Sequence, residues 1–458
     1  MTEVQELADF VAGASIDDLS AEALTQLKIR VLDTIGVAIG ALDAEPIVAI
    51  RGLLRDLGGS EQATMIGGGK TTPERAAFYN SGLSRYLDFM DAYLAKGETN
   101  HPSDNLGAVL AAAESVDGTG ADFLAALAVA YQVHARLSDV APVRAKGFDH
   151  TTQGAYAAAA AAAKALGLPA DRIAHAIAIC GTANNALRVT RTGSLSNWKG
   201  LAYPQVAKEG VFAALLADRG ITGPAEVFEG NKGFKESIAG PFEIDWHAED
   251  LERVRRTIIK KYNAEIHSQS ALDAAMDIRG QDGFRSADIS SVHLTTFDVA
   301  YSIIGGGEEG DKRTVRTKEE ADHSLPWMLA VTLLDGELLP RQYDPARIVA
   351  DDVQDLMSKV TIEPDDGFSA RFPDEMPARL QVELTDGRRL HAEHNAYEGF
   401  HSEPLGWDAA QEKFTSLAAP FADQELRSEI ITVIRSLETE KITSLTSLLG
   451  RVGTTRTR

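Results

Sequence analysis

Two histidines and two carboxylates of this sequence have the types and spacing needed to move protons. Asp88 and Asp91 precede His101, which stands directly before Pro102 at the start of an expected helical turn. His150 comes directly before a long alanine-rich stretch. A histidine held at a turn near carboxylates forms a reasonable acid–base arrangement, because its pKa lies close to neutral pH. Both histidines are therefore candidates for general acid–base catalysis.

Two further segments are rich in lysine and could bind anions. Lys199 follows Trp198, with Lys208 nine residues on, and residues 260–269 read KKYNAEIHSQ. Taken singly, each of the four segments is more often structural, because histidines and lysines at turns usually cap helices or are solvated. From spacing alone, none of the four segments establishes a catalytic site.

The composition argues against several functional classes. Among 458 residues, 45 are basic and 67 acidic, and the net charge of −22 argues against nucleic-acid binding. No uninterrupted apolar run reaches the roughly 18 residues of a membrane span. The acidic N-terminus does not resemble a signal peptide, and a cytoplasmic location is expected. Cys180 is the single cysteine, so the chain cannot supply the thiolates of an iron–sulfur cluster.

Familiar phosphate and metal motifs are absent from the sequence. Gly67-Gly68-Gly69-Lys70-Thr71 lacks the first glycine of a phosphate loop, because position 64 is a threonine. It is expected to be a surface turn, and the glycine-rich segment 305–310 is expected to be a loop. No zinc-type cluster and no Gly-x-Ser-x-Gly elbow occur, and the three histidines between 391 and 401 look like surface residues. The sequence therefore predicts neither a metal nor a cofactor.

The pattern along the chain predicts a mainly helical protein with an inserted α+β part. Residues up to about 269 read as helix after helix, including seven consecutive alanines at 157–163, which favour a tightly packed helix. Strands are expected at 289–297, 360–363, 379–384 and 388–393, the last two joined at Asp386-Gly387. We therefore expect an all-helical domain over 1–269, an α+β lid domain over 270–403, and C-terminal helices over 404–458 that return to the helical domain.

Taken together, several segments resemble the 2-methylcitrate dehydratase (MmgE/PrpD) family, which also contains cis-aconitate decarboxylase and iminodisuccinate epimerase. The resemblance covers nearly the whole chain and includes VLDTIG at 31–36, LDFMDAY and HPSDN within 87–105, KKYNAEIHSQSALDAA at 260–275, and ADHSLPWMLAVTLLDGEL at 321–338. It implies the fold outlined above, a small di- or tricarboxylate as substrate, and a homodimer.

The family's functional positions can be carried onto this sequence residue by residue. The resemblance implies catalytic roles for Asp88, His101, His150, Lys199, Lys260 and Tyr301. Substrate binding is expected from residues in or beside the same motifs, namely Asp91, Ser103, Lys261 and His267. Two departures from the family pattern bear on the substrate. Ala92 replaces a common threonine at the start of a longer loop over 92–100, and the glycine-rich segment 305–310 lies close to Tyr301.

The leading functional prediction is a cluster-free hydro-lyase that acts on 2-methylcitrate or a relative. Removing a proton beside a carboxylate builds a dianionic, enediolate-like species that needs local positive charge. The histidines would serve as base and acid, Lys199 and Lys260 would bind carboxylates, and Asp88 would orient His101 or a lysine. The alternatives are epimerisation of a substituted succinate, decarboxylation of a cis-aconitate-like acid, or a catalytically silent binding protein. The 321–338 segment favours the dehydratase.

Overall fold

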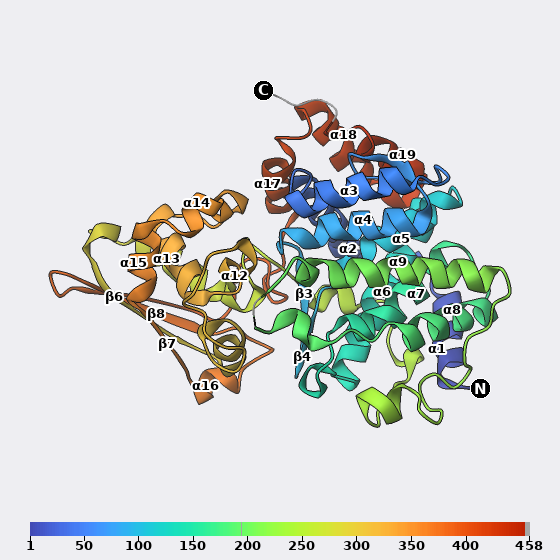
Figure 1. The fold of residues 1–458 in the computed structure, drawn as a ribbon, viewed down its shortest axis with the longest axis horizontal. Coiled ribbons are helices and arrows are strands. Elements are labelled where there is room, and N and C mark those ends of the chain that lie inside the picture. Colours follow the sequence, from blue (N-terminus) through green and yellow to red (C-terminus); the bar gives the residue numbers. More distant parts are fainter. Residues whose placement is uncertain (194, 454–458) are drawn as a thin grey trace. The chain divides into compact units, whose positions relative to one another are not determined.

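The chain folds into two compact units, each built from separate stretches of sequence. The computed structural model describes residues 1–193 and 195–453. Unit 1 contains Met1–Arg188, Gly200–Ile258 and Leu405–Arg458, and unit 2 contains Val189–Lys199 and Ile259–Pro404 (Figure 1). The chain is largely helical, as predicted, with few and small sheets. Within the described ranges, no helix is long and apolar enough to cross a membrane.

Unit 1 is a bundle of helices around a core rich in small residues. Its helices are α1 (Glu3–Gly13), α2 (Ala21–Gly40), α3 (Glu45–Leu57), α4 (Pro73–Tyr86), α5 (Leu106–Ser115), α6 (Gly120–Val140), α7 (Thr151–Ala165), α8 (Ala170–Ala183), most of α9 (Trp198–Asp218), α17 (Trp407–Ala418), α18 (Gln424–Arg435) and α19 (Ile442–Leu449).

The alanine-rich helix α7 lies at the centre of this bundle. It packs against α5, α6 and α8, and all seven alanines of 157–163 are fully buried. A Cβ added at Gly210 of α9 would lie 2.9 Å from the Cβ of Ala158, so the two helix backbones approach closely. Small side chains are what allow this approach, and the sequence predicted a tight centre for the same reason.

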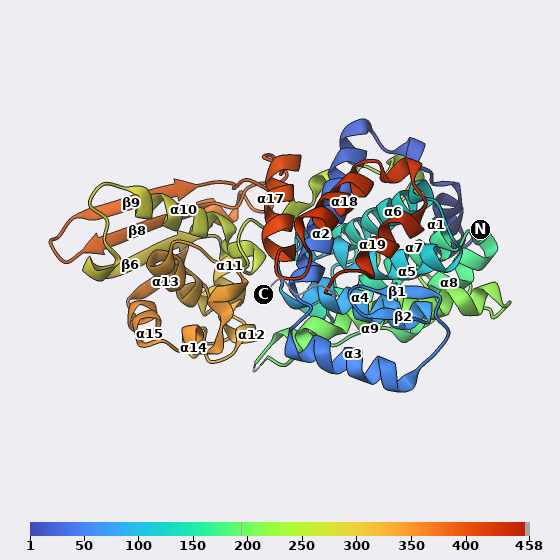
Figure 2. The same cartoon turned by 90° about the horizontal axis from the view of Figure 1, so that it is seen from above.

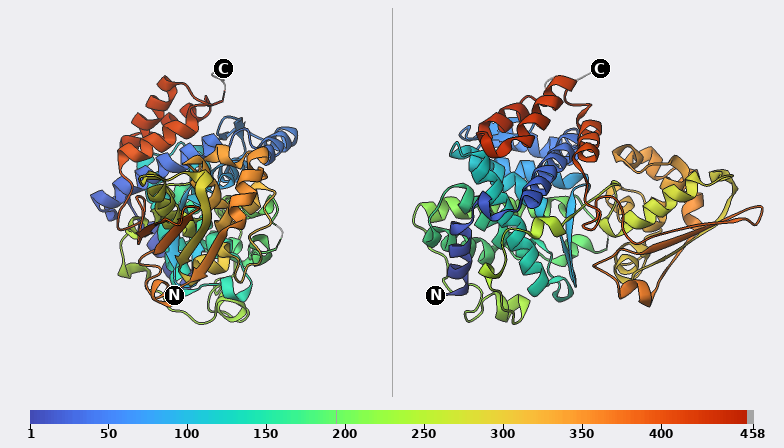
Figure 3. Two further views of the ribbon diagram at one scale, coloured as in Figure 1. Left: turned by 90° about the vertical axis from the view of Figure 1, so that its left-hand side faces the viewer. Right: turned by 180° about the vertical axis from the view of Figure 1, so that it is seen from behind.

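The C-terminal helices pack on the N-terminal ones in the same unit (Figure 3). Helix α17 lies along α2, and Gly36 and Gly40 of α2 make room for it. A Cβ at Gly36 would lie 3.1 Å from Phe414, and one at Gly40 would lie 3.3 Å from Leu417. A bulkier residue at either position would push the two helices apart.

Two small hairpins interrupt the helical part, so the expectation of an all-helical stretch up to 269 is wrong in detail. Strand β1 (Ala63–Met65) pairs with β2 (Gly69–Thr71), and β3 (Asp91–Ala95) with β4 (Glu98–Asn100). Gly67 and Gly68 lie in the turn between these two strands, as predicted, with a φ of +65° at Gly67, and Gly69 begins β2. Gly97 has a φ of +95° in the second turn, a conformation that glycine adopts without strain.

Unit 2 is built on a four-stranded mixed sheet in the order β7-β6-β8-β9 (Figure 2). The strands are β6 (Ile289–Thr296), β7 (Val360–Pro364), β8 (Ala378–Leu384) and β9 (Arg389–His394). The parallel pair is β6 with β7, and the other neighbours are antiparallel. All four strands were predicted at these places, and Gly387, with a φ of +84°, makes the predicted turn between β8 and β9.

Helices cover this sheet and share its apolar core. They are α10 (Gln269–Gly280), α13 (Leu325–Asp335) and α15 (Asp351–Ser358), with the shorter helices α11 (Asp298–Ala300), α12 (Lys318–Ala321), α14 (Pro345–Ile348) and α16 (Asp366–Ser369). Helix α10 packs on β8 and β9, and α13 packs on β7 and on α10. The short strand β5 (Ile258–Ile259) stands where unit 1 passes into unit 2.

Candidate functional site

In unit 1, Asp88 is fixed by an arginine that the sequence did not single out. The Arg85 Nη1 donates to the Asp88 Oδ1 at 2.7 Å, and both side chains are buried. Asp88 also has a φ of +56°, a left-handed conformation that aspartate tolerates better than most residues. Asp88 lies two residues beyond the end of α4, at the start of the segment that leads to His101.

Both carboxylate oxygens of Asp91 accept hydrogen bonds within unit 1. Its Oδ1 accepts from the backbone N–H of Ser103 at 3.1 Å and its Oδ2 from the Tyr131 hydroxyl at 2.7 Å. Burial raises the pKa of Asp91, although Arg30, whose Nε lies 4.0 Å from Oδ2, opposes that rise. These contacts make Asp91 the anchor of the turn that carries His101 and Ser103.

His101 has a defined tautomer. Its Nδ1 lies 2.8 Å from the backbone carbonyl oxygen of Asp91, and a carbonyl can only accept a hydrogen bond. Nδ1 therefore carries the hydrogen in the neutral ring, which makes Nε2 the basic nitrogen. The rings of His101 and His150 are 5.5 Å apart between centroids and meet edge to face. The two histidines singled out from the sequence, 49 positions apart, thus lie side by side.

His150 has a carboxylate on one side and a third histidine on another. Its Nδ1 lies 3.1 Å from the Asp149 Oδ1, and its ring stacks on His134 at 6.2 Å. The His134 Nε2 lies 3.3 Å from the backbone oxygen of His150. Burial lowers the pKa of His134 to about 4, so this ring is neutral at physiological pH. His134 supports His150 as a neutral donor, a role that nothing in the sequence indicated.

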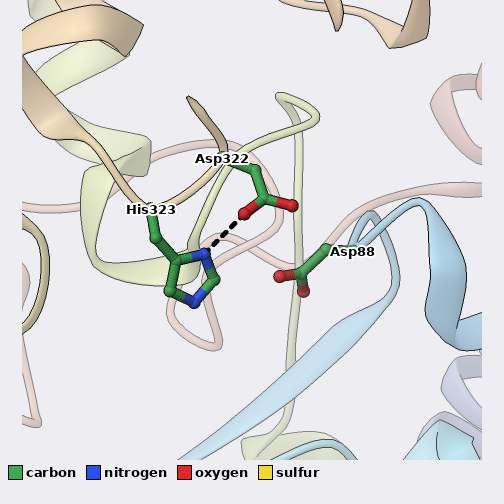
Figure 4. A group of neighbouring side chains, drawn as sticks. All are labelled: Asp88, Asp322 and His323. Carbon is green, nitrogen blue, oxygen red and sulfur yellow. Dashed lines mark hydrogen bonds and ion pairs between the residues drawn. The ribbon is translucent and has the colours of Figure 1, made fainter. Parts of the chain in front are cut away.

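In unit 2, Lys199 belongs to a buried ion cluster centred on Asp322. The Lys199 Nζ lies 2.7 Å from the Asp322 Oδ1 and 3.0 Å from the His323 Nδ1. Lys318 donates to the other oxygen of Asp322 at 2.6 Å. Figure 4 shows the hydrogen bond between Asp322 and His323, whose atoms are 2.7 Å apart. Burial opposes ionisation of Asp322, but Lys199, Lys318 and His323 outweigh it and hold its pKa far below the ordinary value.

A second buried carboxylate, Glu265, lies in the same unit beside more cations. Its Oε1 is 2.8 Å from the His267 Nδ1, and its backbone N–H donates to the Asp322 carbonyl. Burial acts to raise the pKa of Glu265, but His267, His323 and Lys260 lower it to about 2. Unit 2 therefore concentrates positive charge around two acids, although the chain as a whole is strongly negative.

The depressed pKa of Glu265 leads to an expected dependence of stability on pH. The carboxylate is ionised in the folded chain down to about pH 2, against an ordinary value of 4.5. Its contribution to stability, on the order of 3 kcal/mol, is therefore complete above about pH 4.5 and is lost as the pH falls towards 2. In Glu265→Gln, the melting temperature should fall less steeply between pH 5 and 3 than in the wild type.

The control for this measurement is Glu398→Gln, which changes an exposed carboxylate of the same unit. Its melting temperature should follow the wild-type pH dependence. Parallel slopes for the wild type and Glu265→Gln would contradict the expectation, whatever the absolute loss of stability in the variant.

Lys261 and Tyr301 lie in different surroundings. The Lys261 Nζ pairs with Asp273 at 2.8 Å and is partly exposed, while its neighbour Lys260 is buried. Tyr301 begins a single π-type turn, Tyr301–Gly305, and its ring packs against Gly305 and Gly307. The lack of a Cβ at these glycines leaves room for the ring, which gives a structural reason for glycine beside Tyr301.

Eight of the ten predicted residues thus gather in two groups, one in each unit, and Lys261 and Tyr301 stand apart from both. Unit 1 brings together Asp91, His101, Ser103 and His150, with Asp88 at the head of the same segment. Unit 2 brings Lys199 to Asp322, and Lys260 and His267 to Glu265. Sequence reasoning missed Arg85, His134, Glu265, Asp322 and His323. Three of these, Glu265, Asp322 and His323, lie inside the motifs that carried the family resemblance, which was the available signal.

The Asp322 and His323 pair has atoms that can ligate metals, but its surroundings fit cations of the chain itself. The ammonium groups of Lys199 and Lys318 each lie within 2.7 Å of an Asp322 oxygen. A divalent ion would have to displace them or be repelled by them. The arrangement is suited to holding lysines that face anions.

Comparison with known proteins agrees with the family resemblance. Residues 5–247 match the MmgE/PrpD N-terminal domain and residues 262–439 match the MmgE/PrpD C-terminal domain. The 2-methylcitrate dehydratase of Salmonella typhi is 28% identical over 421 residues, covering 85% of this chain and 83% of that protein. The 2-methylcitrate dehydratase of Cupriavidus necator is 30% identical over 346 residues, covering 69% of each.

A relative with another activity is also similar over nearly the full length. The cis-aconitate decarboxylase of Mus musculus is 23% identical over 472 residues, covering 97% of this chain and 93% of that protein. The relatives named dehydratase support the predicted enzyme class, a hydro-lyase. Since both domain matches run in order along the chain, it belongs to the MmgE/PrpD family.

Proposed function

We propose that this chain is a cluster-free hydro-lyase that dehydrates 2-methylcitrate or a closely related di- or tricarboxylate. The observation that carries the proposal is the pairing of His101 and His150, whose ring centroids are 5.5 Å apart. Dehydration needs one group that takes a proton from carbon and another that gives a proton to the departing hydroxide. Two adjacent histidines of different surroundings can fill these two roles.

In the proposed mechanism, the neutral ring of one histidine removes the proton beside a substrate carboxylate. The other histidine, protonated, donates to the hydroxyl on the neighbouring carbon, which leaves as water while the carbon–carbon double bond forms. The Asp91 carbonyl fixes the Nδ1 hydrogen of His101 and so leaves Nε2 as its basic atom. Asp149, 3.1 Å from the His150 Nδ1, favours the protonated ring there. We therefore assign His101 as the base and His150 as the acid.

The cations of unit 2 are proposed to bind the substrate carboxylates. Lys199 and Lys260 are buried there, and His267 and His323 stand beside the two acids that hold the cluster. An enediolate-like intermediate gains most from charges fixed in a dry site before it forms. Asp88 is proposed to position Arg85, and Asp91 to position His101, so that neither carboxylate touches the reacting carbon.

The same residues support a second candidate, decarboxylation of a cis-aconitate-like acid. The observation that favours it is the full-length similarity to the mouse cis-aconitate decarboxylase. Dehydration forms a carboxylate-stabilised carbanion by loss of a proton and then releases the hydroxyl group as water. Decarboxylation forms such a carbanion by loss of carbon dioxide, and a protonated histidine then supplies the proton that the carbon takes up. The 2-methylcitrate dehydratases among the relatives, at 27–30% identity in bacteria, favour dehydration.

Two further features belong to the proposal. The enzyme works without an iron–sulfur cluster, because one cysteine cannot ligate one. It is also proposed to act as a homodimer, with unit 2 as the smaller lid domain, both of which rest on the family. Sedimentation at several protein concentrations tests the dimer.

The proposed reaction is tested by ultraviolet absorbance in the band of conjugated unsaturated acids. Purified protein with a chelator should cause this absorbance to rise on 2-methylcitrate, at the same rate as without chelator. A folded protein that gives no rise on 2-methylcitrate or citrate isomers would contradict dehydration. Release of carbon dioxide from cis-aconitate would then favour the second candidate.

A further inference from the structure

A buried ion pair joins the N-terminal and C-terminal helices of unit 1. The Lys413 Nζ of α17 lies 2.8 Å from the Asp33 Oδ1 of α2. The side chain of Asp33 is 1% exposed and that of Lys413 is 11% exposed. Neither residue is part of the acid–base machinery described above.

The packing of α2 on α17 explains why the pair forms. Asp33, Gly36 and Gly40 follow one another at intervals of three and four, so they share one face of α2. The two glycines let α17 come within 3.1 Å of where their side chains would stand. This close approach brings Lys413 against Asp33, whose place in the motif VLDTIG had no functional explanation.

Lys413 also reaches the segment that carries the candidate acid–base residues. Its Nζ donates to the backbone oxygen of Phe89 at 2.7 Å and lies 3.8 Å from the centroid of the Phe89 ring. Phe89 lies between Asp88 and Asp91. The Asp91 carbonyl in turn accepts from the His101 Nδ1 at 2.8 Å. One chain of contacts thus runs from Asp33 through Lys413, Phe89 and Asp91 to His101.

We propose that Lys413, fixed by Asp33, is a positioning residue that holds the Asp88–Asp91 segment and through it His101. The inference rests on the proposed function, because it assigns the purpose of the positioning to proton transfer by His101. The C-terminal helices then contribute to catalysis without touching the substrate.

The cost of the ion pair supports a positioning role over a merely stabilising one. Burial raises the pKa of Asp33 and lowers the pKa of Lys413, so each charge is disfavoured where it stands. Apolar side chains of similar volume at a helix contact are often at least as stable as a buried ion pair. A directed ammonium group, in contrast, can hold a backbone carbonyl and an aromatic ring at one place.

Lys28 provides a matched control for Lys413. It also lies in unit 1, its side chain is also 11% exposed, and it joins α2 to the C-terminal region. Its Nζ donates to the Arg435 backbone oxygen at 2.8 Å and to Glu438 at 2.9 Å. Lys28→Met therefore also removes an ion pair and a hydrogen bond to a backbone oxygen, but these bonds go to Arg435 and Glu438 and not to Phe89.

The test compares Lys413→Met with Lys28→Met in the full chain, with 2-methylcitrate as substrate. Lys413→Met should lower kcat roughly 10- to 100-fold, the scale of a misplaced catalytic group, with KM within about threefold of the wild type. Hydrogen exchange, read by mass spectrometry, should accelerate in residues 87–103. Lys28→Met should leave both kcat and this exchange unchanged, even where it loses as much thermal stability.

Equal kcat and equal exchange in the two variants would overturn the proposal. Should Lys413→Met fail to fold, Asp33→Asn, which keeps the side-chain volume, is judged by the same two measurements. If the wild type does not turn over 2-methylcitrate, the proposed function fails, and the exchange of residues 87–103 alone decides whether Lys413 holds this segment.

Discussion

Replacing His101 with asparagine is expected to lower kcat on 2-methylcitrate roughly 100- to 10,000-fold, the usual contribution of a general base. The amide of asparagine can take the place of Nδ1 and keep the hydrogen bond to the Asp91 carbonyl. It has no counterpart of Nε2, the atom assigned to proton abstraction. His101→Asn therefore removes the reactive nitrogen while retaining the local anchor, and steady-state kinetics with a melting curve measures both.

The control for this variant is His391→Asn, which changes an exposed histidine on β9 of unit 2. It should leave kcat within about twofold of the wild type. Near-normal turnover by a folded His101→Asn would contradict the assigned role. A loss that disappears when the variant is assayed at higher pH would instead point to a role for His101 in setting the ionisation of another group.

The surroundings of His150 fit its proposed role as the acid in the same step. Its neighbour His134 stays neutral, since burial lowers the pKa of that ring to about 4. A neutral donor beneath His150 does not compete with it for a proton near pH 7. The two histidine rings that pack against His150 thus differ in kind: His101 is proposed to exchange protons, and His134 only contacts the backbone oxygen of His150.

The sequence could predict features that depend on local pattern. Alternation and a glycine turn placed the hairpin of β8 and β9, and a run of alanines placed the helix at the centre of unit 1. The two short hairpins of unit 1 escaped notice because each strand has only three to five residues. So few residues show no clear alternation.

The site was predictable only where family motifs marked it. His101 and His150 come from separate segments, and nothing in their spacing places their rings 5.5 Å apart. That contact depends on how α6, α7 and the turn at 101–105 pack. His134 lies in α6, which is buried along nearly its whole length, and Lys413 lies in α17, which has an exposed face, but nothing in either sequence marks the polar residue that faces inward. Packing alone reveals that His134 is fully buried, that Lys413 is largely so, and that both reach the segments that carry the candidate residues.

The strongest expected effect in unit 2 comes from Lys199→Met, which should lower kcat/KM on 2-methylcitrate roughly 30- to 1,000-fold. Losing a buried, charge-assisted contact with a carboxylate costs about 2–4 kcal/mol, which corresponds to that range. Methionine keeps the length and apolar stem of the side chain and removes only the ammonium group. The proposal that Lys199 binds a substrate carboxylate therefore predicts loss of binding with retention of fold.

Substitution of two other lysines, Lys208 and Lys318, provides the controls for Lys199→Met. Lys208 lies nine residues further along α9 and pairs with Glu209 nearer the surface, so Lys208→Met should leave kcat/KM unchanged. Lys318 binds the same Asp322 as Lys199, through the other oxygen. If Lys199→Met acted only by disturbing Asp322, Lys318→Met would reproduce its full effect.

Thermal stabilisation by citrate separates binding from turnover in the same variants. A ligand that binds only the folded state raises the melting temperature in proportion to the logarithm of its concentration over Kd. Citrate should stabilise the wild type, Lys208→Met and Lys318→Met, and should stabilise Lys199→Met much less. Equal stabilisation of Lys199→Met and the wild type would mean that the ammonium group of Lys199 faces Asp322 alone. Its burial beside Asp322 would then serve the fold of unit 2, and Lys260 would remain as the buried lysine proposed to bind a substrate carboxylate.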